Sequence, residues 1–318
     1  MAQIDRVLRS NLKLRHLQML VALDQFRHLG RAAEFLSVTQ PAVSKTLAEI
    51  ESMFGLPLFE RSTRGTEPTP AGASVVRFAR SVLAGYERTR EEIAAEASGA
   101  VGRTRVGAMV VATPVLLAQA VERLKARSIH TTVLIEEGDL TRLLPKLRLG
   151  ELDLFVGRLE PGYASPDLET EALYAEPMAV VVQPGHALAR KRKPQWADLA
   201  ALPCVMPPPW ASLRVKLDQM FFAHDLHPPA DIVESASFLA QLSFIHQRGA
   251  VAFMARAVAQ HFAQQGQVAV LPLAVPIDLP PVGLITLRGQ RPTPGTEQLI
   301  ACLREVAAGM RKKPRAKA

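Results

Sequence analysis

The segment that most restricts the fold of this 318-residue chain is residues 30–61, GRAAEFLSVTQPAVSKTLAEIESMFGLPLFER. Its first helical stretch contains Ala32 and Ala33, which are small enough to let another helix approach closely. Thr39 is a suitable N-cap for a second helix, and Pro41 falls in the first turn of that helix, where its missing N–H costs nothing. Two short helices joined by a tight turn predict a helix-turn-helix.

The second helix of this segment has two different faces. Its inward face is apolar and comprises Val43, Leu47 and Ile50. Its opposite face is small, polar and basic, and comprises Gln40, Pro41, Ser44 and Lys45. Such a face fits the major groove of DNA, where Gln40 would read adenine bidentately and Ser44 and Lys45 would contact phosphate or base. The alternative is an ordinary solvated helix face.

The stretch GLPLFERSTRGTEPTPAG, which follows that helix, predicts the wing of a winged helix. Leu58 and Phe59 would anchor a short strand, and a turn at Gly65 follows it. Arg61 and Arg64 lie on this strand and turn, where they would contact phosphate or the minor groove.

One long helix is expected over residues 70–97, with an apolar stripe of Val75, Phe78, Val82, Tyr86 and Ile93. A helix of this length rises roughly 40 Å, which is long for an ordinary globular element. Its stripe needs a partner, and a second copy of the chain is the simplest one. The alternative is a helix packed on its own domain.

From residue 103 the pattern changes to β-α-β-α-β, which predicts a parallel sheet covered on both faces. The pattern restarts after an irregular stretch, so we expect an α/β multidomain protein whose C-terminal part has two lobes with a cleft between them. The expected domains are 1–69, the linker helix 70–100, and 101–318. Within the last, lobe 1 covers about 101–173 and 273–310, lobe 2 covers 174–272, and 311–318 is a basic tail.

The net charge of +8 and the pI of about 9.8 permit a nucleic-acid partner, although five basic residues lie in the last eight. The two cysteines, Cys204 and Cys302, exclude a disulfide scaffold and a Cys-based zinc site. No apolar run is long enough for a membrane span or a signal peptide. We expect a soluble, cytoplasmic protein with no membrane, metal or cofactor.

Taken together, LRHLQMLVAL, AAEFLSVTQPAVSKTLAEIE, FGLPLFER and EPTPAG resemble the LysR-type transcriptional regulators, and GELDLFVG fits the same family more weakly. The resemblance implies a winged helix-turn-helix, a dimerising linker helix and a two-lobed effector domain like periplasmic binding proteins. It also implies a homotetramer on double-stranded promoter DNA, a small-molecule effector and RNA polymerase as a further partner. Gln40, Pro41, Ser44 and Lys45 match the family's recognition-helix contacts; Lys45 stands where many members have Arg, which makes bidentate guanine reading less secure.

Two helix starts are candidate effector contacts, because free N–H groups and hydroxyls there suit a carboxylate or another small anion. Thr113 precedes Pro114 as an expected N-cap, and Ser212 precedes a second helix with Arg214 close by. The candidate apolar walls are Trp210 and Phe238, and Arg158 would face either the cleft or the surface. These groups could instead be plain caps and core residues.

The segment 109–112 is apolar where family members often place a Ser or Thr that faces the effector. Either the anion contact has moved to Thr113, or the site favours an apolar ligand body. Enzyme motifs such as a Walker loop, GxGxxG or GxSxG are absent from the sequence, so no catalytic residue is expected. The sequence leaves two less favoured classes. The missing export signal and the groove-facing helix argue against a solute-binding protein or enzyme with an accessory helical domain, and a nonspecific architectural DNA binder would need no effector lobes.

Overall fold

The computed structural model describes residues 2–62, 65–98, 102–209 and 211–312. The chain forms two compact units, one of Met1–Gly102 with Pro145–Leu152 and one of Arg103–Leu144 with Asp153–Ala318. Within the described ranges, no helix is both long enough and apolar enough to span a membrane.

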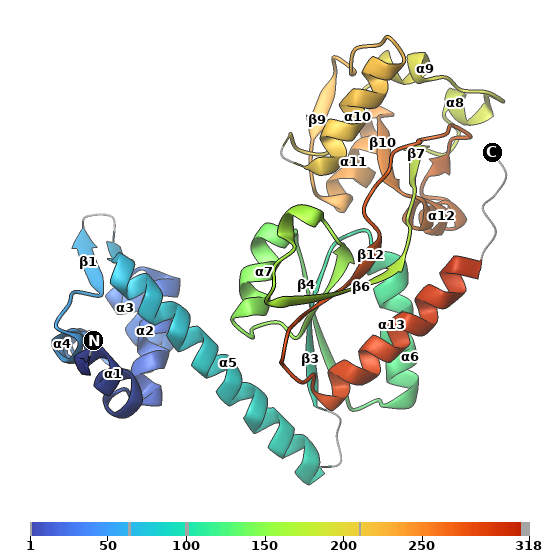
Figure 1. Cartoon of the computed structure of the whole chain (residues 1–318). Helices are drawn as coiled ribbons and strands as arrows, with labels where there is room; N and C mark the ends of the chain where they lie inside the picture. The colour runs from blue at the N-terminus through green and yellow to red at the C-terminus, as the bar shows by residue number, and fades with distance from the viewer. Residues whose placement is uncertain (1, 63–64, 99–101, 210, 313–318) are drawn as a thin grey trace. The chain divides into compact units, whose positions relative to one another are not determined.

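The first unit is a helical bundle with a two-stranded hairpin (Figure 1). Its elements are α1 (Ala2–Arg6), the π-helical turn η1 (Val7–Asn11), α2 (Leu14–Phe26), α3 (Leu29–Phe35), α4 (Gln40–Phe54), β1 (Phe59–Ser62), β2 (Gly65–Pro68) and α5 (Pro70–Ser98). The strands β1 and β2 pair in antiparallel register, with Phe59 opposite Pro68 and Ser62 opposite Gly65. The winged helix-turn-helix predicted from the sequence is therefore present.

The core of this unit is formed where α2, α3 and α4 meet. Ala32 and Ala33 of α3 are buried, as the close approach of another helix requires. They share one hydrophobic cluster with the inward residues of α2 and α4, including Leu20, Leu23, Val43, Leu47 and Ile50. Burying these branched side chains on one face leaves the other face of α4 free for contacts outside the bundle.

The start of α5 is joined closely to the wing. The hydroxyl of Thr69 donates to the carbonyl of Pro57 at 2.9 Å and accepts from the Gly72 N–H at 3.0 Å. A Cβ atom at Gly72 would lie 1.8 Å from the Leu58 carbonyl oxygen, so only glycine fits there. The wing and the first turn of α5 are thus in direct backbone contact.

The first lobe of the second unit is built on a five-stranded sheet in the order β4-β3-β5-β12-β6. Its elements are β3 (Arg103–Ala108), η2 (Thr113–Leu117), α6 (Ala118–Arg127), β4 (Thr132–Glu137), α7 (Leu140–Arg148), β5 (Leu154–Arg158), η3 (Pro161–Tyr163), β6 (Leu168–Tyr174), β12 (Val282–Leu287) and α13 (Pro294–Lys312).

The second lobe has a five-stranded sheet in the order β11-β7-β10-β8-β9. Its elements are β7 (Met178–Val182), α8 (Ala187–Arg190), α9 (Trp196–Ala200), β8 (Cys204–Met206), α10 (Ser212–Ala223), β9 (Ile232–Glu234), α11 (Phe238–Arg248), β10 (Val251–Ala255), α12 (Arg256–Gln264) and β11 (Ala269–Val270).

The parallel pairing predicted from the β-α-β-α-β stretch is confirmed for β3, β4 and β5, but each complete sheet also contains antiparallel pairs. Strands β4, β3 and β5 are parallel, but β12 runs antiparallel to both β5 and β6. In the second lobe β8, β9 and β10 are parallel, whereas β7 is antiparallel to β10 and β11. The physical reason is the topology: the chain leaves the first sheet after β6 and returns to it at β12. The returning strand pairs in the middle of the sheet without a right-handed crossover helix of its own.

One hydrophobic cluster draws its residues from both lobes. It includes Val111 and Leu116 from the first lobe together with Val205, Ile245 and Val258 from the second. A second cluster, which includes Trp196, Phe221 and Phe253, belongs to the second lobe alone. The two lobes therefore share part of their apolar packing.

Candidate DNA-binding surface and effector site

Helix α4 begins and is oriented as the sequence indicated. Thr39 is its N-cap, with an extended backbone and a hydroxyl that accepts from the Ala42 N–H at 3.4 Å. Val43 and Ile50 are almost fully buried, whereas Gln40, Pro41 and Lys45 are exposed. The leading face of α4 is thus available to another molecule.

The wing contacts this face through a side-chain hydrogen bond. Arg61 of β1 donates from its guanidinium to the hydroxyl oxygen of Ser44, at 2.8 Å. Ser44 is half-buried beside the exposed Lys45. The bond uses a lone pair of Ser44 and leaves the hydroxyl hydrogen for a phosphate oxygen or a base acceptor. Ser44, Lys45 and Arg61 form one surface, whereas Arg64 lies outside the described residues.

Glu51 positions β1, a role that the sequence analysis missed. Its carboxylate oxygen accepts from the Leu58 N–H at 2.7 Å and from the Phe59 N–H at 3.0 Å. Hydrogen bonds to a carboxylate are stronger than those between neutral groups. Because the bond joins residues seven and eight positions apart across a loop, no local pattern signals it.

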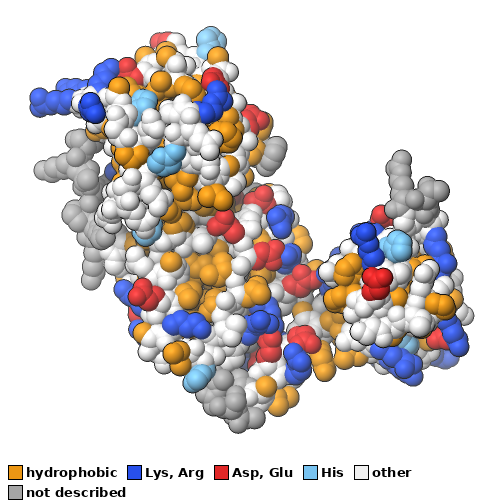
Figure 2. All heavy atoms as spheres, turned by 180° about the vertical axis from the view of Figure 1, so that it is seen from behind, with side chains coloured by type: hydrophobic (Ala, Val, Ile, Leu, Met, Phe, Trp, Pro, Cys, Tyr) orange, Lys and Arg blue, Asp and Glu red, His pale blue; other side chains and the backbone are white. Residues whose placement is uncertain are grey.

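The charge of the first unit suits a polyanion. Figure 2 shows Lys and Arg side chains gathered along the edge of this smaller body, with fewer Asp and Glu side chains among them. A positively charged surface attracts the phosphates of DNA, and this attraction does not depend on the base sequence.

The effector candidates in the second unit are engaged with the protein itself. Thr113 is not the N-cap of its helical turn, because that position belongs to Ala112. The Thr113 hydroxyl donates to the Met109 carbonyl at 3.2 Å, and the Ala112 N–H bonds to the same oxygen at 2.8 Å. A tight turn over 109–113 therefore shifts the helix start by one residue.

Ser212 is likewise the first residue of α10 rather than its N-cap, which is Ala211. The Ser212 hydroxyl donates to Glu160 at 3.0 Å, and this bond joins the two lobes. Arg214 forms ion pairs with Asp218 at 3.0 Å and Glu234 at 2.7 Å. Two carboxylates already balance this guanidinium.

Arg158 lies at the end of β5 and is buried. It donates to the carbonyl oxygens of Pro280 at 2.9 Å and Glu176 at 2.8 Å. Glu176 lies on the outgoing segment between β6 and β7, and Pro280 lies on the return segment before β12. Burial lowers the pKa of Arg158. Arg158 therefore ties together the two segments that connect the lobes, and the surface position considered for it is wrong.

Of the two residues predicted as apolar walls of the effector site, the structure describes only Phe238. Phe238 is partly buried against the cluster shared by both lobes, with its ring centroid 4.7 Å from that of Phe262. Trp210 lies outside the described residues.

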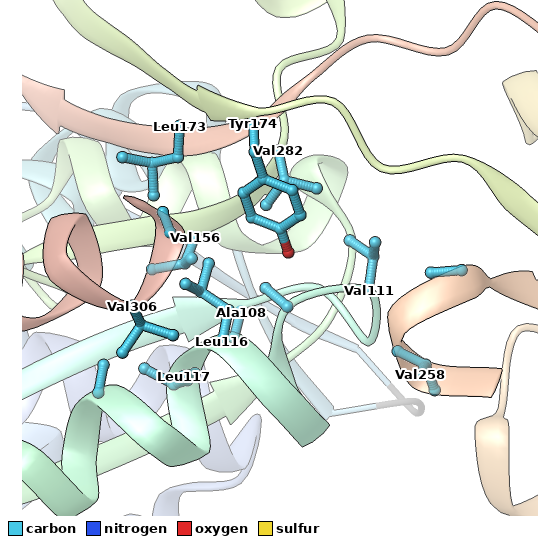
Figure 3. Packing of buried hydrophobic residues seen from close by; sticks show 14 of the residues in the cluster. Ala108, Val111, Leu116, Leu117, Val156, Leu173, Tyr174, Val258, Val282 and Val306 are labelled. Carbon is cyan, nitrogen blue, oxygen red and sulfur yellow. The ribbon is translucent and has the colours of Figure 1, made fainter. Parts of the chain in front are cut away.

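The cluster shared by both lobes also contains Tyr174, the last residue of β6, whose ring extends among aliphatic side chains (Figure 3). No sequence pattern pointed to Tyr174. The ligand roles assigned from sequence to Thr113, Ser212, Arg214 and Phe238 stay predictions.

Cys204 is buried in β8, and burial raises the pKa of its thiol to about 12. Cys302 is also buried, and its pKa is raised for the same reason. Within the described ranges, no group of three or more His, Cys, Asp or Glu side chains is arranged to hold a metal ion.

A winged helix followed by a two-lobed α/β unit defines a class of DNA-binding regulators, and comparison with known proteins identifies the family. Residues 14–73 match the model of the bacterial regulatory helix-turn-helix protein, lysR family, and residues 97–308 match the LysR substrate binding domain. The chain belongs to the LysR family of transcriptional regulators.

The relatives match over nearly the whole chain. The regulator GbpR of Azospirillum brasilense is 32% identical, with 93% of this chain and 87% of that protein covered. PcaQ of Agrobacterium fabrum is 29% identical, with 93% and 95% covered. Among solved structures, the LysR family regulator CbnR has a TM-score of 0.72 at 20% identity, covering 93% of this chain and 99% of that one. This chain is a DNA-binding transcriptional regulator whose second unit is the ligand-binding domain of the family.

Proposed function

We propose that this protein binds dyad-symmetric promoter DNA through paired α4 helices and that a small organic effector, bound between the lobes of the second unit, controls the binding. The observation that carries the proposal is the leading face of α4, where Gln40, Pro41 and Lys45 are exposed while the opposite face is buried. Half-sites separated by whole helical turns match two such helices in a dimer. CbnR, which shares the fold, has also been solved with its target DNA.

Pairing of α5 helices supplies the dimer. The exposed fraction of Val82 is 36%, that of Tyr86 is 45% and that of Ile93 is 64%. Large apolar side chains spaced along one helical stripe are stabilised by a partner helix. Their exposure in the single chain supports a second copy over packing within the same domain.

A second surface supports assembly beyond the dimer. Strand β4 is an edge of its sheet, and Leu134 and Ile135 on it are exposed, as is Ile129 just before it. An exposed apolar edge strand is a liability unless another chain covers it. Two separate apolar surfaces on one chain are what a homotetramer requires.

Effector binding acts in this proposal as a population shift between arrangements of the two lobes. The lobes are joined by two connecting segments, by the Ser212–Glu160 bond and by shared apolar packing. A ligand bound among these groups would favour one arrangement. The sequence-based prediction that the effector is an organic anion concerns this same site between the lobes. Titration with benzoate, described below, tests that prediction. With promoter DNA as its target, the protein would act in the cytoplasm and meet RNA polymerase.

Peroxide sensing is the second candidate, because one relative is the hydrogen peroxide-inducible genes activator of Haemophilus influenzae, at 30% identity over 57% of this chain. A redox-sensing cysteine needs an accessible thiol with a lowered pKa. Cys204 and Cys302 are both buried with raised pKa values. These properties argue against peroxide sensing through either cysteine.

The proposal is tested by footprinting the full chain on the DNA that flanks its own gene, with the oligomeric state measured by light scattering. We expect protection of a dyad-symmetric site by a tetramer. Failure to retard any flanking fragment at low ionic strength would refute DNA regulation, and a monomer would refute the assembly.

A further inference from the structure

We infer that the phenolic hydroxyl of Tyr174 is a specificity contact for the effector, donating a hydrogen bond to an uncharged acceptor on an otherwise apolar molecule. The inference rests on the proposed function and names the ligand class of its effector site. It starts from one observation: the Tyr174 hydroxyl is buried, and none of the described residues forms a hydrogen bond with it. Buried polar groups in native proteins nearly always have a partner, so each exception needs an explanation such as a ligand or an ordered water.

The location of this hydroxyl matches a ligand site. Tyr174 ends β6, directly before the segment that leads into the second lobe. Figure 3 shows its oxygen directed toward Ala108 and Val111, with Val258 of α12 beyond them. The same apolar cluster contains residues of both lobes. A ligand that bonds to this oxygen would therefore contact the lobes where they meet.

The surroundings decide the charge of the ligand. The neighbouring segment 109–112 is apolar, and Phe238 and Phe262 pack against the same cluster. The buried Arg158 is bonded to two carbonyl oxygens, and Arg214 is paired with two carboxylates. Burying a carboxylate here would cost more desolvation free energy than the single hydrogen bond to Tyr174 returns, because the guanidinium groups of Arg158 and Arg214 already donate to protein oxygens. A ketone, ether or ester oxygen on an apolar body satisfies the hydroxyl at a lower desolvation cost.

The site also explains why the phenol stays protonated and acts as a donor. Burial raises the pKa of Tyr174 well above its ordinary value, and the nearby Glu176 acts in the same direction. A neutral phenol has one O–H to donate, and an acceptor is the partner it lacks.

The test uses the full chain and three probes of similar size: acetophenone, which carries one neutral acceptor; ethylbenzene, which carries none; and benzoate, which carries a charge. The thermal unfolding midpoint is followed as each probe is titrated into the wild type, Tyr174→Phe and Tyr163→Phe. Tyr163 is a matched control, because it lies in the same unit and the residue is 38% exposed.

We expect acetophenone to raise the midpoint of the wild type and of Tyr163→Phe more than ethylbenzene does. In Tyr174→Phe its apparent affinity should fall about three- to tenfold, the worth of one neutral hydrogen bond, so that the preference disappears. Without any probe, Tyr174→Phe should unfold at the same or a higher temperature than the wild type, because an unsatisfied hydroxyl has been removed.

Three results would overturn the inference. The first is that acetophenone and ethylbenzene raise the midpoint of the wild type equally, or that neither raises it. The second is that benzoate stabilises the wild type and Tyr174→Phe equally and better than acetophenone, which would favour an anionic effector. A lower midpoint for ligand-free Tyr174→Phe would show that a resident water already satisfies the hydroxyl. Operator binding by ligand-free Tyr174→Phe separates any of these failures from a failure of the proposed function.

Discussion

The guanidinium of Arg61 in the wing donates a hydrogen bond to the hydroxyl of Ser44 in α4, at 2.8 Å. This bond joins two parts of the DNA-binding surface that are separated by 17 positions in the chain. It fixes the wing strand beside the second turn of the recognition helix. Contacts of the wing with phosphate and contacts of α4 with bases are therefore mechanically linked.

The first prediction concerns Gln40 as a base-reading residue. Gln40→Ala should weaken binding to the cognate operator by about 1–3 kcal/mol while leaving binding to random DNA nearly unchanged, because only the base contact is lost. Fluorescence anisotropy at one fixed salt concentration measures both. Gln25→Ala removes another exposed glutamine from the end of α2 and serves as the control. Equal losses on operator and random DNA would remove Gln40 from the specificity residues.

The second prediction concerns Arg61 as a phosphate contact. Arg61→Ala should lower affinity for all sequences and reduce the slope of log K against log salt by about 1, since one counterion fewer is released. Ser44→Ala keeps the arginine and should leave the salt slope unchanged. Arg90→Ala, a change of an exposed arginine on α5, is the charge control. An unaltered slope in Arg61→Ala would contradict the role.

The third prediction concerns the apolar stripe of α5. Ile93→Glu should shift the assembly toward smaller species by at least about tenfold in dissociation constant, because an unpaired charge would be buried between paired helices. Light scattering as a function of protein concentration measures the change. Ser81→Glu adds the same charge on another, exposed face of α5 and should leave the assembly intact. Similar behaviour of both variants would show that the stripe is not an interface.

The fourth prediction concerns pH and His16, which is buried in α2. Burial and the nearby charges of Arg15 and Lys13 hold the pKa of His16 below its ordinary value of 6.5. The unfolded chain then binds this proton more readily than the folded chain. The free energy of unfolding should therefore be unaffected by His16 above pH 6.5 and should fall as the pH drops below 6.5 toward the folded pKa.

Titration of the His16 ring by NMR and the midpoint of unfolding between pH 7.5 and 5 check this prediction. His16→Gln should flatten the pH dependence of that midpoint, whatever its effect at pH 7.5. A His16 that titrates at or above 6.5 in the folded protein would disprove the argument.

The fifth prediction concerns Arg158, which bonds to both segments that connect the lobes. Arg158→Met keeps much of the side-chain volume but leaves the Pro280 and Glu176 carbonyls without their donor. We expect the second unit to lose about 2–4 kcal/mol of unfolding free energy, measured with denaturant. Arg291→Ala, at an exposed position of the same unit, should be nearly neutral. An equally neutral Arg158→Met would contradict the bridging role.

Sequence features within a few residues of one another predicted the fold of the DNA-binding unit well. Thr39, Pro41 and the apolar spacing of α4 are read directly from neighbouring residues, and the helix begins where they indicate. The long helix also begins at Pro70 as expected. Each of these features depends on contacts within a few positions, which is the range over which helix caps and periodicity act.

Features that depend on distant contacts were missed. The antiparallel pairing of β12 with β5 joins residues more than a hundred positions apart, for example Val282 and Arg158. One partner of Arg158, Pro280, is equally remote in sequence, and the other, Glu176, lies 18 positions away. The helix starts at Thr113 and Ser212 were misplaced by one residue, because backbone hydrogen bonds of the preceding turns set them. The unsatisfied hydroxyl of Tyr174 is a property of packing, which no short pattern encodes.

The backbone contact between Gly72 and Leu58 has a consequence for signalling. Because the first turn of α5 rests directly on the wing, with Thr69 bonded to both, that junction has no slack to absorb a rotation of the helix. A rotation of the first turn of α5 would therefore carry the wing with it and change how the wing meets DNA.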